Sequence, residues 1–371
     1  MREEGRYSEC VMHRSDDASP FFASYFQGRN VLVVGGAGFD PRACNAVQHL
    51  NRSGAQAQLH LIREHRPGPT DALTAAAKKN LELFQKLASA IHVTDVEIFG
   101  NDGAIVGGRR AAHAVSELDL RSYDDVIVDI SALSIGTSFP IVRLLVEEFA
   151  RNAQPKNLHV TVTHDPGIDA RITRTAGDRP GWVHGFSGAL GVDHDQNPAW
   201  LWMPQLASGA QQEIRRIYDF VQPDDTCPIL PFPARDPRLA DDLALEYREE
   251  LLSTWDVDVR NIVYADEDDP LDVYRTILRI DDLRKPVFEG SGGSATIVSP
   301  TSSKLTALGA LMASTERDLP VAYLEAENYA LEASAATPSM TRPVAASPGL
   351  VHLWLEGEAY SNGRPALRRE V

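Results

Sequence analysis

A buried strand, a tight polar loop and a helix are predicted, in that order, by the stretch Ser294-Ala-Thr-Ile-Val-Ser-Pro-Thr-Ser-Ser-Lys304-Leu-Thr-Ala-Leu-Gly-Ala-Leu-Met312. The loop places the hydroxyls of Thr301, Ser302 and Ser303 and the ammonium of Lys304 at the first turn of the helix. Backbone N–H groups there are unpaired and carry partial positive charge, so they bind anions. The glycines of a Walker A loop are absent. The stretch therefore predicts either an anion site, with Ser299 as a further hydrogen-bonding group, or a helix cap followed by an incidental lysine.

Apolar strands alternate with helical patterns through the first half of the chain. The predicted strands are 30–36, 57–62, 93–99, 125–130 and 158–163. The predicted helices are 41–52, 71–90, 108–118 and 138–152. Strands that are apolar throughout and alternate with helices indicate a parallel sheet covered on both faces.

The second half repeats this alternation less regularly. Its predicted helices are 207–221, 236–254, 270–283 and 303–314, and its predicted strands are 261–264, 294–299, 321–324 and 352–355. We therefore expect an α/β, Rossmann-like fold. It should have a mostly parallel sheet with helices on both faces, either continuous or in two closely fused lobes.

Composition shifts along the chain suggest five segments. These are a flexible lead-in (1–28), an N-terminal Rossmann-like half (29–165), an irregular insertion or connector (166–205), a C-terminal Rossmann-like half (206–360) and a tail (361–371).

Net charge, hydropathy and cysteine spacing limit the classes of function that this protein could have. The net charge of −16 argues against bulk nucleic-acid binding, which needs clustered Lys and Arg. No apolar run approaches the roughly 20 residues of a membrane helix. The three cysteines are widely spaced, which favours a reducing cytoplasm and no metal site. We expect an acidic cytoplasmic protein that does not bind membranes.

A glycine-rich loop follows the first strand. Because ligands of open α/β sheets bind beyond the carboxyl ends of the strands, Gly35, Gly36 and Gly38 would let a ligand approach the backbone. Arg42 could then contact its phosphate or carboxylate, and Ser131 after a later strand adds a hydroxyl. The loop is not GxGxxG, so no nicotinamide cofactor is expected. The pair Asp40-Pro41 favours a helix cap.

Acid–base candidates also lie at strand ends. Asp129 and His164 follow two strands of the first half, and Glu325 follows the strand 321–324. If the protein is an enzyme, these would be its catalytic groups. No recognised nucleophile motif is present.

The stretch from Ile297 to Leu311 resembles the late motif of the CARF and SAVED group of Rossmann-like sensor domains. That motif is a strand, a Ser/Thr/Gly-rich loop with a lysine, and a helix of small and apolar residues. The loop Gly35–Asp40 is similar to the group's other ligand-facing loop, whereas Pro300-Thr-Ser stands where the group has paired glycines. The resemblance implies a sensor from prokaryotic antiviral defence that binds an oligonucleotide second messenger. Its effector would then be on a partner chain.

Three functions follow from these observations. The first is a sensor or regulatory subunit that binds a nucleotide-like anion and has a protein partner or forms a homo-oligomer. The second is a nucleotide-processing hydrolase or transferase on the same fold, and the third is a structural subunit of a larger complex. Fold alone does not separate them.

Overall fold

The computed structural model describes residues 5–151, 157–169, 171–188, 198–331 and 349–360. These residues form two compact units. The first unit contains the described residues of 10–176 and 326–360, and the second contains residues 5–9 and the described residues of 177–325. The predicted tail 361–371 lies outside the described residues.

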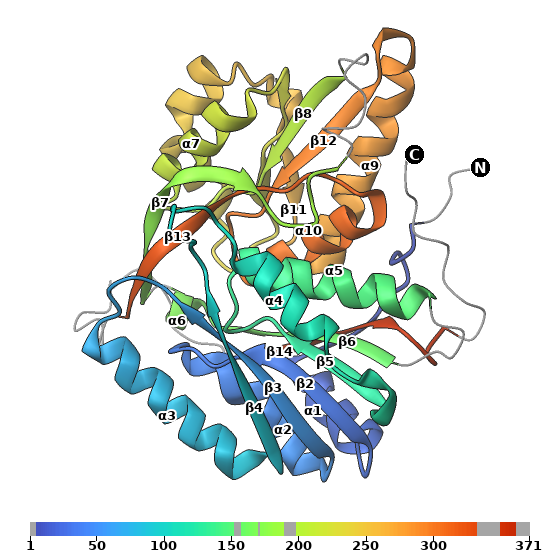
Figure 1. Ribbon diagram of the computed structural model, residues 1–371. Coiled ribbons are helices and arrows are strands. Elements are labelled where there is room, and N and C mark those ends of the chain that lie inside the picture. The colour runs from blue at the N-terminus through green and yellow to red at the C-terminus, as the bar shows by residue number, and fades with distance from the viewer. Residues whose placement is uncertain (1–4, 152–156, 170, 189–197, 332–348, 361–371) are drawn as a thin grey trace. The chain divides into compact units, whose positions relative to one another are not determined.

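A seven-stranded sheet forms the centre of the first unit (Figure 1). Its strands are β1 (Val11–Arg14), β2 (Asn30–Gly36), β3 (Gln56–His65), β4 (Ala90–Glu97), β5 (Asp125–Asp129), β6 (Asn157–His164) and β14 (Gly349–Glu356). Their order in space is β1-β14-β6-β5-β2-β3-β4. The five strands from β6 to β4 are parallel, whereas β14 is antiparallel to β6 and β1 is antiparallel to β14.

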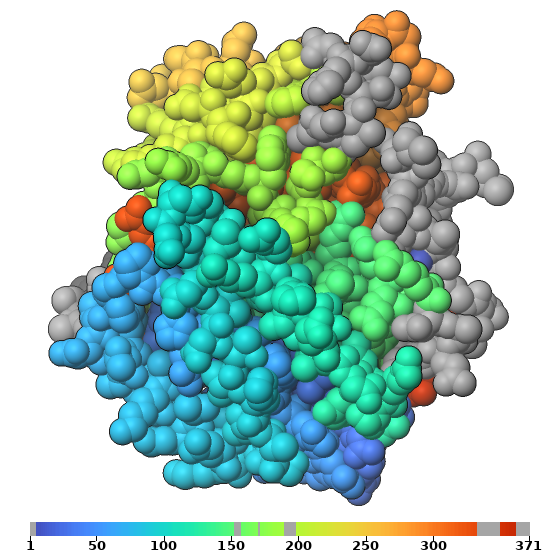
Figure 2. Space-filling view, viewed as in Figure 1, coloured from blue at the N-terminus to red at the C-terminus, as the bar shows by residue number. Residues whose placement is uncertain are grey.

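Helices cover both faces of this sheet (Figure 1). They are α1 (Ser15–Tyr25), η1 (Pro41–Cys44), α2 (Asn45–Ser53), α3 (Asp71–Leu87), α4 (Gly107–Ser116), η2 (Leu120–Ser122), α5 (Ile135–Arg151) and α6 (Pro166–Asp169). One core forms where α1, α2 and α3 pack on Val31, Val33, Leu59 and Leu61. The exposed residues of α3 and α4 contribute to the blue and cyan surface in Figure 2. The predicted α/β, mostly parallel, Rossmann-like class is confirmed.

The segment 1–28 is not the flexible lead-in that the sequence suggested. Its described part contains β1, which pairs with β14, and α1, whose Ala18 and Phe22 are fully buried. Phe26, just beyond the helix, is buried as well. The apolar residues between the charged ones form a one-sided helix face that docks on the sheet.

The last predicted strand, 352–355, was assigned to the C-terminal half, and this was wrong. It forms β14, which lies between β1 and β6 in the sheet of the first unit. An apolar strand shows that it is buried but not which sheet buries it, so the chain's return to the first unit leaves no local signal.

Parallel strands also form the centre of the second unit. They are β8 (Ala199–Pro204), β9 (Asp225–Thr226), β10 (Ile229–Pro231), β11 (Val263–Ala265) and β12 (Ser294–Ser299). β8 lies between β12 and β9, and β10 pairs with β11. Single parallel bridges join Gln205 to Ile229 and Val298 to Val321. β7 (Ile172–Trp182) and β13 (Ala322–Leu331) pair with each other, and each contains residues of both units.

The segment 166–205 was expected to be irregular, and the structure differs. It contains β7 and β8, and β8 is the middle strand of its three-stranded sheet. The pattern Ala199-Trp-Leu-Trp-Met203 is apolar and aromatic, which is typical of a buried strand, but the prolines and glycines before it hid the signal.

The helices of the second unit are α7 (Gln211–Val221), α8 (Leu239–Glu246), η3 (Glu250–Thr254), η4 (Val259–Asn261), α9 (Pro270–Phe288), η5 (Glu289–Ser291) and α10 (Lys304–Arg317). Every residue of α10 after Lys304 is buried. Gly309 lets α10 approach α9 closely, because a Cβ there would lie 2.7 Å from the Cβ of Val273 and still closer to the carbonyl oxygen of Pro270.

Candidate functional site

The start of α10 combines the hydroxyl-rich loop with the end of β12, as the sequence predicted. Ser303 caps the helix, since its hydroxyl accepts from the backbone N–H of Thr306 at 3.2 Å. Ser302, Ser303 and Lys304 are half-buried. The loop therefore presents polar side chains at a helix N-terminus that is partly open to solvent.

Two of the predicted hydroxyls are instead used inside the unit. Ser299 is fully buried and accepts from the indole N–H of Trp202 at 2.9 Å. Thr301 is 2% exposed, and its hydroxyl donates to the backbone carbonyl of Gln205. These two residues fix the loop against β8 and are not free to bind a ligand directly.

Gln205 is a polar group at this place that the sequence did not reveal. It follows β8 directly, and its Nε2 donates to the carbonyl oxygen of Thr306 at 3.1 Å, so its amide lies beside the first turn of α10. The residue is 2% exposed, and its Oε1 has no hydrogen-bond partner among the described residues. A buried acceptor without a donor costs about 1–3 kcal/mol, so this oxygen calls for a donor from a ligand or a water.

In the glycine loop of the first unit, the close contact is with the protein's own backbone. A Cβ at Gly36 would lie 2.6 Å from the carbonyl oxygen of Ala132, so this glycine is needed for the loop after β5 to pack. At Gly35 and Gly38 the nearest atoms would be at 3.7 and 3.8 Å, an ordinary contact. Asp40 is the helix cap that the sequence favoured, because its carboxylate accepts from the N–H of Arg42.

Arg42 does not have the role that the sequence suggested. Its guanidinium is held by two carboxylates, Asp40 at 2.8 Å and Asp169 at 2.7 Å, and the residue is only 4% exposed. Burial opposes its charge, but these carboxylates raise its pKa well above the ordinary value. The positive charge is thus balanced within the unit, and we do not retain Arg42 as a ligand contact.

The N-terminus of α5 already has an anion of its own. The Glu64 carboxylate on β3 accepts from the backbone N–H of Ser134 at 2.9 Å and from its hydroxyl at 3.0 Å. Arg66 pairs with the same carboxylate at 2.9 Å. Burial would raise the pKa of Glu64, but Arg66 and Ser134 outweigh it and hold that pKa below the ordinary value. A strand-end carboxylate therefore occupies the place where a bound anion would lie.

The acid–base candidates are buried. Asp129 is 3% exposed and accepts from the N–H of Ser131 at 3.0 Å, and the Ser131 hydroxyl accepts from the N–H of Thr163 at 2.8 Å. This arrangement ties the loop after β5 to β6. His164 is 6% exposed at the end of β6, and Glu325 is 2% exposed on β13 in the other unit. The structure therefore places Asp129 and His164 in one unit and Glu325 in the other.

Metal and thiol chemistry find no support in the part of the chain that the structure describes. No cluster of three or more His, Cys, Asp or Glu side chains there could hold a metal ion. Burial raises the pKa of the Cys44 thiol to about 12, and Asp129 adds to this effect. Cys44 is a packed core residue, as the sequence indicated.

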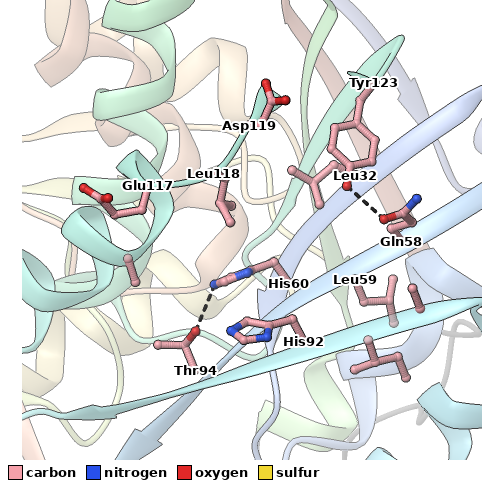
Figure 3. A pocket seen from close by; sticks show the side chains of 13 residues that line it. Leu32, Gln58, Leu59, His60, His92, Thr94, Glu117, Leu118, Asp119 and Tyr123 are labelled. Atoms are coloured by element: carbon pink, nitrogen blue, oxygen red, sulfur yellow. Dashed lines mark hydrogen bonds between the residues drawn. The ribbon is translucent and has the colours of Figure 1, made fainter. Parts of the chain in front are cut away.

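A cavity of about 500 Å³ opens over β2, β3 and β4 of the first unit (Figure 3). His60 lies at its floor with Nε2 3.1 Å from the Thr94 hydroxyl, and the Tyr123 hydroxyl donates to Gln58 at 2.9 Å. None of the described residues that line the cavity is Lys or Arg, whereas two of them, Glu117 and Asp119, are acidic. This cavity is unsuited to an anion.

Comparisons with known proteins leave the family open. No protein-family model matches the chain, and no curated protein matches it. Among solved structures it is similar to one from Pseudomonas aeruginosa UCBPP-PA14, described as a candidate universal stress protein. The identity is 12%, the TM-score is 0.22, and the match covers 82% of this chain and 95% of that one.

A second similar structure is the cytoplasmic domain of a prokaryotic cation chloride cotransporter. Its identity is also 12%, its TM-score is 0.21, and the match covers 81% of this chain and 96% of that one. Scores this low carry no argument about function. No helix within the described ranges is both long and apolar enough to cross a membrane.

Proposed function

We propose that this protein is a sensor or regulatory subunit that binds a nucleotide-like anionic small molecule at the start of α10. The observation that carries the proposal is the buried amide of Gln205. Its Oε1 requires a donor, while its Nε2 is fixed on the first turn of α10. A ligand that supplies an O–H or N–H group there would remove the cost of the unpaired acceptor.

The anionic part of the ligand follows from the groups around that amide. Lys304 supplies a positive charge, Ser302 supplies a hydroxyl, and the first turn of α10 supplies backbone N–H groups. A nucleotide combines a phosphate for these groups with sugar hydroxyls or base N–H groups for the Gln205 oxygen. An inorganic anion would satisfy the first set only.

The wider role rests on the sequence alone. The resemblance to CARF and SAVED domains supports an oligonucleotide messenger, a place in antiviral defence and an effector on a partner chain or a second copy. Widely spaced cysteines support a cytoplasmic location. Fold likeness adds nothing to these points.

The proposal is tested by calorimetric titration of the full chain with AMP, a linear oligoadenylate and a cyclic oligonucleotide. We expect at least one of these probes to bind. Lys304→Ala should weaken that binding by tenfold or more, because a hydrogen bond to a charged group contributes about 1.5–3 kcal/mol. Lys78→Ala is the charge-matched control, since Lys78 is exposed on α3, and it should bind like the wild type.

Two results would overturn the proposal. One is that none of the three probes binds to the wild-type protein. The other is that a probe binds the Lys304→Ala variant as tightly as the wild type, which would place the ligand elsewhere.

A further inference from the structure

A chain of buried hydrogen-bonded rings crosses four adjacent strands of the first unit. His13 on β1 lies opposite His352 on β14, with their Nδ1 atoms 3.0 Å apart. His352 Nε2 lies 2.9 Å from Nδ1 of His159 on β6, and His159 Nε2 lies 3.1 Å from the carboxylate of Asp125 on β5. His352, His159 and Asp125 are fully buried, and His13 is half-buried.

The carboxylate sets the direction of every hydrogen bond in this chain. Ionised Asp125 only accepts, so His159 must donate from Nε2, and its Nδ1 must accept. His352 then donates from Nε2 to His159 and accepts at Nδ1 from the Nδ1–H of His13. Each neutral imidazole thus uses one donor and one acceptor, and the chain is fully satisfied with one proton per ring.

The same chain is equally well satisfied with one more proton. A proton that binds His13 at Nε2 lets His13 pass its Nδ1 proton to His352. His352 then passes its Nε2 proton to His159, which becomes an imidazolium beside Asp125. Three ring protons become four. Both ring-to-ring contacts and the contact to Asp125 keep a donor and an acceptor, and no heavy atom has to move.

We propose that His13, His352, His159 and Asp125 form a proton-binding site, which takes one proton from solvent at His13 and holds it at His159 beside Asp125. The site is separate from the ligand site proposed at α10 and does not depend on it. Buried polar networks are costly unless every member is satisfied, and this one is satisfied in both protonation states.

The charged groups around the chain favour a proton at the Asp125 end. Arg29 donates to Asp125 at 2.6 Å, and Glu358 lies 3.4 Å from Arg29, so these three groups carry one surplus negative charge. Tyr25 lies 3.1 Å from Asp125. At the other end, Asp17 on α1 attracts a proton to His13, and His49 on α2 reaches the same helix at Ser19.

Burial sets the pH range of proton uptake. It lowers the pKa of His159 below the ordinary value of 6.5, and the contact with Asp125 offsets this only in part. Burial also lowers the pKa of His352 and of His13. The three rings are therefore neutral at pH 7, and proton uptake is expected only as the pH falls below the ordinary histidine value of 6.5.

The test is nitrogen NMR of the full-length protein labelled with ¹⁵N-histidine, recorded as the pH is lowered from 7.5. At the start, His13 should carry its proton on Nδ1, and His159 and His352 on Nε2. In acid, His159 should become an imidazolium, while His352 and His13 stay neutral with their protons on the opposite nitrogens. Circular dichroism at each pH shows whether the fold persists.

Variants distinguish proton transfer through His352 from independent protonation of His13 and His159. His352→Gln keeps a donor and an acceptor in place but cannot relay a proton, so His159 should remain neutral while His13 titrates alone. Asp125→Asn should abolish the imidazolium at His159. His113→Gln is the control, because His113 is exposed on α4, and it should change nothing in the chain.

Three outcomes would overturn the proposal. His13 could protonate with no tautomer change at His352 and His159, or His159 could protonate unchanged in His352→Gln. The protein could also unfold before any ring changes. If Asp125→Asn does not fold, the wild type and His352→Gln alone decide the matter.

Discussion

Two helices of this molecule start in comparable surroundings but differ in charge. At α5, Glu64 from the neighbouring strand β3 accepts from Ser134 just before the first turn. At α10, Gln205 from the end of β8 lies beside the first turn, as a neutral amide with one unpaired oxygen. The first helix start has a carboxylate as its neighbour, whereas the neighbour from the adjacent strand at the second is a neutral amide.

The difference shows that position at a strand end does not by itself make an anion site. Both helix starts lie beyond the carboxyl ends of parallel strands, where ligands of α/β proteins bind. At α5, a carboxylate already accepts from the backbone N–H and the hydroxyl of Ser134, and its negative charge complements the helix dipole. A charged carboxylate beside the start of α5 and a neutral amide beside the start of α10 thus distinguish a structural cap from a candidate binding site.

The largest expected effect comes from removing the built-in anion. Glu64→Ala leaves Arg66 buried without its carboxylate partner, so the free energy of unfolding should fall by about 3–5 kcal/mol. Urea unfolding followed by circular dichroism measures this. Glu117→Ala, at the exposed residue that follows α4, is the control and should change stability little. A loss below 1 kcal/mol for Glu64→Ala would show that α5 does not depend on its internal anion.

Acid should destabilise the first unit more than the second, because nearly all described histidines belong to the first unit. Burial, aided by His92, lowers the pKa of His60 to about 4 from 6.5. A histidine kept neutral by the fold stabilises it above pH 6.5, and this stability is lost as the pH falls from 6.5 toward 4. For His60 the loss is about 3 kcal/mol.

Hydrogen exchange at pH 7 and pH 5 measures the response of each unit. We expect protection to fall more in β3 and β4 than in β8 and β12, and His60→Gln to reduce that fall. Equal losses in the two sheets would contradict the prediction.

A smaller effect is expected from the packing of α10. Gly309→Ala places a Cβ against the backbone of Pro270, so α9 and α10 must separate slightly, at about 1–3 kcal/mol. Gly290→Ala, where no atom lies within 4 Å of the added Cβ, is the matched control. Thermal unfolding compares the two variants. If Gly309→Ala is as stable as Gly290→Ala, the close approach of the two helices is not needed for stability.

Local patterns were sufficient to predict most of the fold. The strands at β2, β5, β6 and β12 and the caps at Asp40 and Ser303 followed from apolar runs and capping residues. The place of β14 and the order of the seven-stranded sheet did not, because they depend on contacts between distant segments. The docking of α1 was missed because its charged residues conceal a one-sided apolar face.

The candidate site was predicted only in part. The hydroxyls of Ser302 and Ser303 and the charge of Lys304 lie together as expected, since they are adjacent in sequence. The neutralisation of Arg42 by Asp169 and the position of Gln205 beside Thr306 involve residues about a hundred or more positions apart. No pattern within one segment contains that information.

The most direct test gives α10 the anion that α5 already has. Gln205→Glu, with Gln212→Glu on the exposed side of α7 as the charge-matched control, would be titrated with AMP, the linear oligoadenylate and the cyclic oligonucleotide by calorimetry. We predict that a probe bound by the wild type and by Gln212→Glu is not bound by Gln205→Glu, because the new carboxylate repels the phosphate and cannot donate to the carbonyl oxygen of Thr306 as the Gln205 amide does. Equal binding by all three proteins, or binding by none, would contradict a ligand site at the start of α10.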